Sequence, residues 1–142
     1  MKKNKQGDLL YAVCSQQKVG ALATCDGKAA HSSLVFFAAE KKTEKLVFAT
    51  LRTTRKYTNL RKYPDVSMLI DSRTDYPDNI SASTAITVNG KADEVTGEEL
   101  EECRKLLLAK HPALADFLDH EDCAVIVVRD VTVFTVDTFG NA

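Results

Sequence analysis

A short run of hydroxyl and basic side chains is the part of this sequence best suited to chemistry. Thr53, Thr54, Arg55 and Lys56 follow the apolar segment 46–50 and open a helix-favouring run. The threonines are candidate N-caps, and the first turn of a helix leaves N–H groups free beside the positive end of its dipole. Cations in that turn oppose the dipole unless an anion binds nearby. The pattern predicts a phosphate-sized anion site, with a solvated basic helix as the alternative.

The other reactive residue types form no comparable pattern. His111 and His120 have no third ligand at metal-binding spacing, so we expect a helix end and an exposed turn rather than a metal site. No Ser-His-Asp set or carboxylate pair stands out for hydrolysis. The chain has four cysteines and no CxxC pair, so we expect free, mostly buried thiols at Cys14, Cys25, Cys103 and Cys123.

The elements that must position the basic run are mainly short strands. Apolar runs of strand length, separated by turn signals, are expected at 18–25, 30–39, 46–50, 66–70, 85–92, 123–128 and 131–136, the last two turned at Arg129 and Asp130. Helical spacing predicts helices over 6–16 and from Thr96 to His111, with Thr96 and Glu99 forming a capping box. The order predicts an antiparallel β-barrel, mainly β with helices, as one domain over residues 1–142.

Composition limits the partners and the compartment. The chain has 142 residues, 44% of them hydrophobic, with 19 basic and 20 acidic side chains. This balance gives no reason to expect nucleic acid or an anionic membrane as a partner. No apolar run reaches the roughly 20 residues of a membrane span, and the start lacks the pattern of a signal peptide. We therefore expect a cytoplasmic protein.

Four short motifs in a fixed order carry a resemblance to a known family. They are Phe48-Ala49-Thr50 at a strand end, Thr54-Arg55-Lys56, Asn59-Leu60-Arg61 and Pro64-x-Val66. Over residues 18–94 the chain resembles the FMN-binding split-barrel proteins related to pyridoxamine 5'-phosphate oxidase. The resemblance implies a split β-barrel that binds FMN at the interface of a homodimer, and an oxidoreductase acting on a small substrate or redox partner.

The resemblance also implies which residues hold the cofactor. The second strand would lie along the flavin and ribityl chain, the third strand end would contact it, and the following helix would hold the phosphate through Thr54, Arg55 and Lys56. The full set is His31, Ser32, Ser33, Leu34, Val35, Ala49, Thr50, Thr54, Arg55, Lys56 and Asn59.

Two departures separate this chain from the true oxidases. His31 and Phe36 stand where the oxidases have an arginine and a lysine, and the sequence stops at Ala142 without their C-terminal arginine segment. Vitamin B6 oxidation is therefore not expected, and no catalytic acid or base is identified. The alternatives are a non-catalytic flavin-binding protein and a haem-binding or deazaflavin-binding relative of the same fold.

Overall fold

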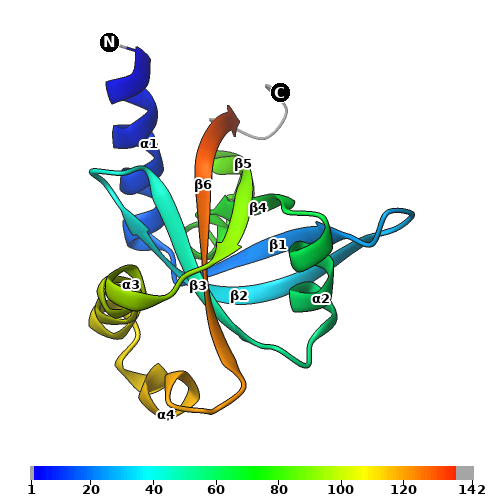
Figure 1. The fold of residues 1–142 in the computed structure, drawn as a ribbon. Helices are drawn as coiled ribbons and strands as arrows, with labels where there is room; N and C mark the ends of the chain where they lie inside the picture. The colour runs from blue at the N-terminus through cyan, green and yellow to red at the C-terminus, as the bar shows by residue number, and fades with distance from the viewer. Residues whose placement is uncertain (1, 137–142) are drawn as a thin grey trace.

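Six antiparallel strands close into a barrel in the computed structural model, which describes residues 2–136 (Figure 1). The barrel order is β1-β2-β3-β6-β5-β4, and every neighbouring pair is antiparallel. This confirms the predicted mainly β architecture. The strands are β1 Val19–Cys25, β2 Ala30–Glu40, β3 Lys45–Leu51, β4 Asp65–Asp71, β5 Ala85–Glu94 and β6 Cys123–Val136.

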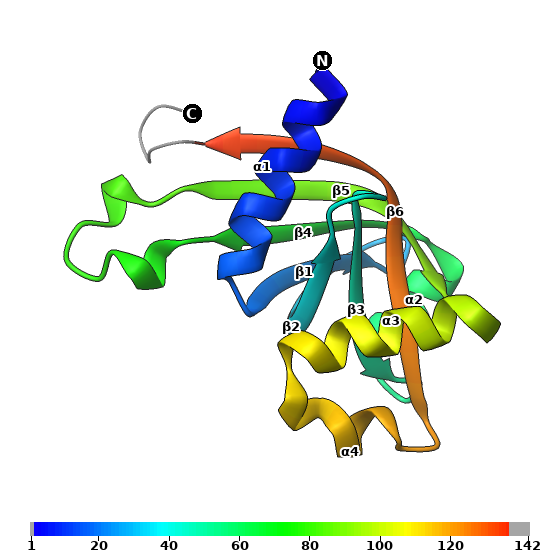
Figure 2. The same cartoon turned by 90° about the vertical axis from the view of Figure 1, so that its left-hand side faces the viewer.

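Helices cover the barrel on several sides (Figures 1 and 2). In Figure 1, α2 lies in the right half beside β1, whereas α3 and α4 lie to the lower left. No helix within residues 2–136 is long and apolar enough to cross a membrane. The helices are α1 Lys2–Gln16, α2 Arg55–Lys62, α3 Gly97–Lys110 and α4 Ala115–Leu118, with short 3₁₀ turns η1 Arg73–Asp75, η2 Ile80–Ala82 and η3 Pro112–Leu114.

The hydrophobic core has two parts, one on each face of the sheet. Alternate residues of β2, such as Val35 and Phe37, point into the barrel, whose open end is covered by Leu10 of α1. The second part packs α3 and α4 against the outer face of β3 and β6, through residues such as Val47 and Leu118. Because β3 is covered on both faces, five of its seven residues are buried, which explains its continuous apolar run.

The expected turn at Arg129 and Asp130 is wrong, because β6 is one continuous strand of 14 residues. Asp130 adopts a positive φ of 54°, and the pairing with β5 shifts register between Asn89 and Lys91. Gly90 lies opposite this irregularity, and a Cβ there would come within 2.7 Å of the Arg129 carbonyl oxygen. A β-bulge therefore bends the strand where the sequence indicated a reversal.

The predicted capping box at the start of α3 is also wrong. Thr96 occupies the N-cap position without a side-chain hydrogen bond. Glu99 instead accepts hydrogen bonds from Arg129 Nη1 and Nη2, at 2.7 and 2.8 Å, and from Lys45 Nζ at 3.3 Å. The hydrogen bonds from Arg129, ahead of those from Lys45, lower the pKa of Glu99 to about 2. A tertiary ion pair between α3 and the strands β3 and β6 thus replaces the local cap.

Candidate functional site

The strands β2 and β3 pair over only part of their length. Their register runs from Phe37 opposite Phe48 to Glu40 opposite Lys45, whereas residues 30–36 of β2 pair with β1 alone. Figure 1 shows the two strands diverging beyond the paired part. Phe37 donates its N–H to Lys18 on the β1 side. Since backbone groups alternate in direction along an antiparallel strand, those of Ser32 and Leu34 face the split, where no described strand pairs with them.

A slot of about 270 Å³ lies at this split, between β2, the end of β3, the start of α2 and the η3–α4 segment. Ligand sites commonly measure about 300–1,000 Å³, so the slot of one chain encloses only part of a nucleotide-sized ligand. Residues far apart in the sequence meet here, because the barrel brings β2 and β3 together beside α2. Six of the residues implied by the family resemblance line the slot: Leu34, Val35, Ala49, Thr50, Thr54 and Lys56.

Four further residues line the slot that were not among the predicted site residues, namely Phe36, Leu51, Leu114 and Phe117. Phe36 had been noted only as a departure from the oxidase pattern, and it is 52% exposed on the outer face of β2. Leu114 and Phe117 come from the segment after α3, and only tertiary packing brings them to the slot. No local signal in the sequence connected them with the threonine and lysine residues.

The polar end of the slot is organised by two threonines. Thr54 is the N-cap of α2, and its Oγ1 accepts a hydrogen bond from the N–H of Tyr57 at 3.4 Å. The same hydroxyl donates to the Leu51 carbonyl at 2.8 Å, so the Thr50 hydroxyl, 2.9 Å away, is placed to donate to Thr54. This confirms the predicted helix start. The N–H groups of Arg55 and Lys56 have no intrahelical acceptor, because they belong to the first turn.

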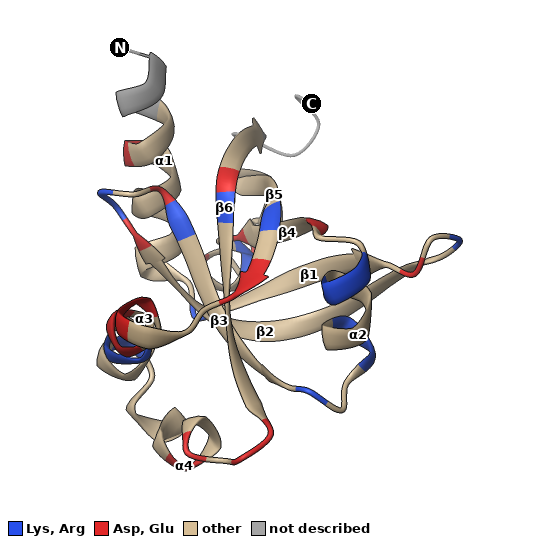
Figure 3. Ribbon diagram, viewed as in Figure 1, with Lys and Arg blue, Asp and Glu red and all other residues tan. Residues whose placement is uncertain are grey.

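The basic residues around α2 differ in what they contact, although Figure 3 shows them gathered on α2 and the loop before it. Arg52 contacts Glu94 at 2.5 Å, and the Tyr57 hydroxyl donates to the same carboxylate at 2.6 Å. Burial alone would raise the pKa of Glu94, but these two hydrogen bonds lower it. Within the described residues, Arg55 and Lys56 make no side-chain hydrogen bond or ion pair, which leaves their charges available.

The remaining predicted site residues lie outside the slot. Arg55 is exposed at the start of α2, where its charge acts on Asp26 in the β1–β2 turn. Asn59 is buried and donates to the Thr24 hydroxyl on β1 at 3.1 Å, which joins α2 to the barrel. His31, Ser32 and Ser33 lie nearer the start of β2. The Ser33 hydroxyl is buried and has no hydrogen-bond partner in the part of the chain that the structure describes.

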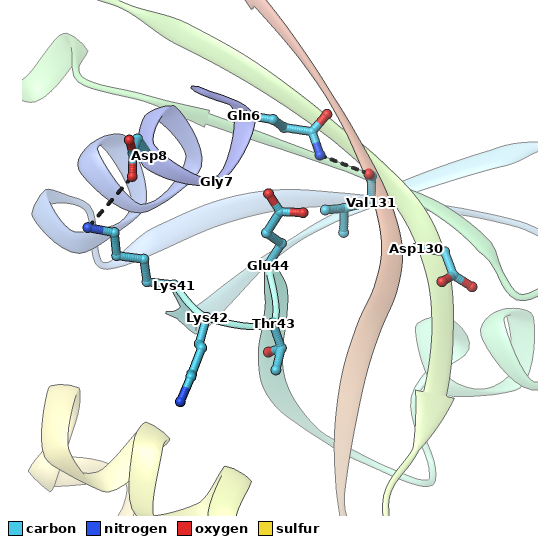
Figure 4. A pocket seen from close by; sticks show the side chains of 9 residues that line it. All are labelled: Gln6, Gly7, Asp8, Lys41, Lys42, Thr43, Glu44, Asp130 and Val131. Atoms are coloured by element: carbon cyan, nitrogen blue, oxygen red, sulfur yellow. Dashed lines mark hydrogen bonds and ion pairs between the residues drawn. The ribbon is translucent and has the colours of Figure 1, made fainter. Parts of the chain in front are cut away.

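A larger hollow of about 970 Å³ lies beside α1, at the β2–β3 turn and the bulge of β6. Figure 4 shows mixed charges there: Lys41 points toward Asp8, Glu44 lies near Val131, and Asp130 points away from them. Lys41 and Asp8 form an exposed ion pair at 3.6 Å. These side chains do not converge on a common point, and no predicted site residue lines this hollow.

Mostly apolar side chains also form a row across the outside of the barrel. The strand registers align Leu34 with Ala21, Ala21 with Leu69, Leu69 with Thr87, and Thr87 with Phe134. Paired residues in a sheet face the same side, so this outer row crosses from β2 to β6. Leu34, Leu69 and Phe134 are 71%, 45% and 55% exposed. Exposed apolar patches of this kind mark interaction surfaces.

The sequence profile described as "Pyridoxamine 5'-phosphate oxidase" matches residues 8–139. The chain belongs to the pyridoxamine 5'-phosphate oxidase family. This confirms the resemblance noted from the motifs, and the match extends it from residues 18–94 to almost the whole chain. No curated protein sequence matches the chain.

Solved structures in and around this family share the fold. A haem-binding protein from Mycobacterium smegmatis superposes with a TM-score of 0.83 and 25% identity, covering 95% of this chain and 55% of that protein. A protein described as a putative pyridoxamine 5'-phosphate oxidase from Listeria innocua superposes with a TM-score of 0.72 and 20% identity, covering 93% of this chain and 98% of that protein. An FAD-binding protein from Mesorhizobium loti superposes with a TM-score of 0.67 and 16% identity, covering 87% of this chain and 88% of that protein. The fold thus occurs in flavin-binding and haem-binding proteins alike.

Proposed function

We propose that this chain binds FMN in the slot at the β2–β3 split and acts as a redox flavoprotein on a small organic substrate or a redox partner. The observation that carries the proposal is the slot itself. It combines a stretch of β2 that has no strand partner on the β3 side, apolar side chains, and a polar end where Lys56 has no ion-pair partner among the described residues. A flavin nucleotide has the matching parts: a flat ring with polar edges and a phosphate.

The phosphate would lie at the polar end, near the start of α2. Lys56 lines the slot there without a partner among the described residues, and the first-turn N–H groups favour an anion. Thr50 and Thr54 already bond to each other and to Leu51, so their main role is to fix the start of the helix. Arg55 lies outside the slot lining and would add its charge from one side.

The ring would lie along β2, where the backbone groups of Ser32 and Leu34 face the split. These groups can hydrogen-bond the polar edge of the ring without disturbing the sheet, because no described strand uses them. When bound, FMN supplies the electron-transfer chemistry. The residues of this chain hold the ring, exclude water with Leu34, Leu51 and Phe36, and position the phosphate.

A second copy of the chain would complete the site. The slot is too small for the whole nucleotide, and its Leu34 also borders a second hollow of about 350 Å³ on the other side of β2. Leu34 is the most exposed member of the outer row, so a partner that covers this row would also close the slot. We therefore propose a homodimer with the cofactor at its interface.

Haem is the second candidate ligand, and the similarity to a haem-binding protein supports it. The histidines argue against it, because none of the 3 in the chain lines the slot. His111 Nε2 is bonded to the Phe37 carbonyl oxygen at 2.7 Å, and His120 Nδ1 accepts from the Asp122 N–H at 3.1 Å. An iron atom in the slot would therefore lack an imidazole ligand from the same chain.

The deciding experiment is titration of the apo-protein with FMN, riboflavin and haemin, followed by absorption and fluorescence. We expect stoichiometric FMN binding with flavin bands, and weaker binding of riboflavin because it lacks the phosphate. Equal affinity for FMN and riboflavin would contradict the proposed phosphate site at the start of α2. A haem Soret band with no flavin binding would favour the second candidate, and preference for a deazaflavin in a parallel titration would change the cofactor.

A further inference from the structure

We propose that Leu114 and Phe117, carried by η3 and α4, form an apolar wall that closes the slot against one face of a planar ring. This proposal rests on the proposed function and adds a residue that selects for the ring. The wall comes from the segment after α3, whereas β2 and β3 line the barrel side of the slot. A flat, apolar ring system would thus be held between the strands and Phe117.

The exposure of the wall supports a role in binding. Phe117 is 36% exposed, whereas the next residue, Leu118, is 3% exposed and packs in the second core cluster with Val47 and Val125. The fold therefore anchors α4 through Leu118 and leaves the neighbouring aromatic ring at the slot. An aromatic side chain left beside an apolar hollow can stack on a ligand ring in an offset or edge-to-face geometry.

The segment that carries the wall is held at both ends. At its start, His111 is buried, contacts the Phe37 carbonyl through Nε2 and lies edge-on to Phe36, with ring centroids 5.5 Å apart. At its end, Arg104 on α3 donates from Nη1 to the Leu118 carbonyl and from Nη2 to Asp119, both at 2.7 Å. Because both ends of the segment are fixed, Phe117 is held at the slot although its side chain has no hydrogen-bonding group.

The wall and the lysine should act on different parts of the ligand. Lys56 lies at the polar end, and Phe117 belongs to the apolar side, so loss of the aromatic ring should weaken the binding of any flavin with the same ring. Arg104 does not line the slot and is a positioning residue, which acts by keeping α4 in place.

The test compares Phe117→Ala and Phe117→Leu with Tyr11→Ala, a control at a similarly exposed aromatic residue on α1, 40% exposed and away from the slot. Each variant is titrated with FMN and riboflavin. We expect Phe117→Ala to weaken both ligands by the same factor, about tenfold, the loss of roughly one good aromatic contact. Phe117→Leu should fall between, and Tyr11→Ala should match the wild type.

The outcomes separate the wall from the cofactor assignment. If the wild type binds FMN and Phe117→Ala binds both flavins normally, the wall is wrong and the FMN proposal stands. Weakening of FMN alone would place Phe117 at the phosphate and also overturn the wall. If the wild type binds no flavin, the FMN proposal fails, and the same variants are titrated with haemin. Weaker haemin binding by Phe117→Ala would then support the wall, and unchanged binding would contradict it. Binding of neither flavin nor haemin overturns both.

Discussion

Lys56 and Arg55 are adjacent in the sequence, but only Lys56 lines the slot. An ammonium group that meets a phosphate in a partly closed site makes a charge-assisted hydrogen bond, whereas an exposed guanidinium acts mainly through screened charge. The two residues thus offer a matched pair for locating the phosphate.

We expect Lys56→Ala to weaken FMN binding by about 1.5–3 kcal/mol, the range for a hydrogen bond to a charged group, and to leave riboflavin binding unchanged. Arg55→Ala should have the smaller effect, and that effect should shrink at high salt. Fluorescence titration with both ligands measures this. Equal losses for FMN and riboflavin in Lys56→Ala would show that the lysine acts on the ring or on folding.

At the residue scale, the sequence led to about half of the slot. The hydroxyl and basic residues of the α2 start were identifiable because N-caps and first-turn cations follow local rules, and the family resemblance added the β2 and β3 residues. The sequence could not show that Asn59 is buried and donates a hydrogen bond to Thr24 of β1. Nor could it identify Phe117, whose position depends on how α4 packs.

The element α2 is held to the barrel by Leu60 in the core and by the hydrogen bond from Asn59 to Thr24. Thr24 is 2% exposed, so removal of the amide leaves its hydroxyl buried without that partner. The helix that presents Lys56 thus depends on a buried polar contact to β1.

We expect Asn59→Ala to destabilise the apo-protein by about 1–3 kcal/mol, the cost of an unsatisfied buried polar group. Urea unfolding measures this, with Asn89→Ala on the exposed face of β5 as the control. If stability is unchanged and FMN binding falls, Asn59 contacts the cofactor directly, as the family resemblance implies.

The element α3 is joined to β3 and β6 by the carboxylate of Glu99, whose pKa is lowered to about 2. A carboxyl group with a lower pKa in the folded state stabilises the fold above its ordinary pKa, near 4.5. This stabilisation is lost as the pH falls from about 4.5 to about 2.

The melting temperature of the wild type should therefore fall more steeply over that range than that of Glu99→Gln. Glu98→Gln is the control, because Glu98 is exposed in the same turn and forms no ion pair within residues 2–136. Parallel pH profiles for the wild type and Glu99→Gln would show that the ion pair contributes little to stability.

At the element scale, periodicity predicted the helices and strands well, and the errors have one physical origin. Thr96 and Glu99 fit a local capping box, and Arg129 and Asp130 fit a local turn, yet both were decided by contacts distant in the sequence. Glu99 pairs with Arg129 across the fold, and the pairing of β6 with β5 continues through the bulge at Gly90. Local propensity gives way where a long-range partner satisfies the same groups.

For the whole molecule, the outer row is the surface most suited to a second copy of the chain. We expect Leu69→Lys to convert the proposed dimer to a monomer, because it places a charge at the middle of the row. Light scattering after size exclusion measures this, and Tyr11→Lys, at a similarly exposed site on α1, is the control. A wild-type monomer that holds FMN stoichiometrically would contradict an interface site.

The split between β2 and β3 has a consequence for the solubility of the ligand-free protein. Residues 30–36 of β2 form an open sheet edge, and unpaired N–H and C=O groups on such an edge can add a strand from another chain. A ligand in the slot would cover this edge. Concentrated apo-protein should therefore aggregate through edge-to-edge association, and saturating FMN should slow the rise in turbidity. Equal rates with and without ligand would show that the edge is already protected.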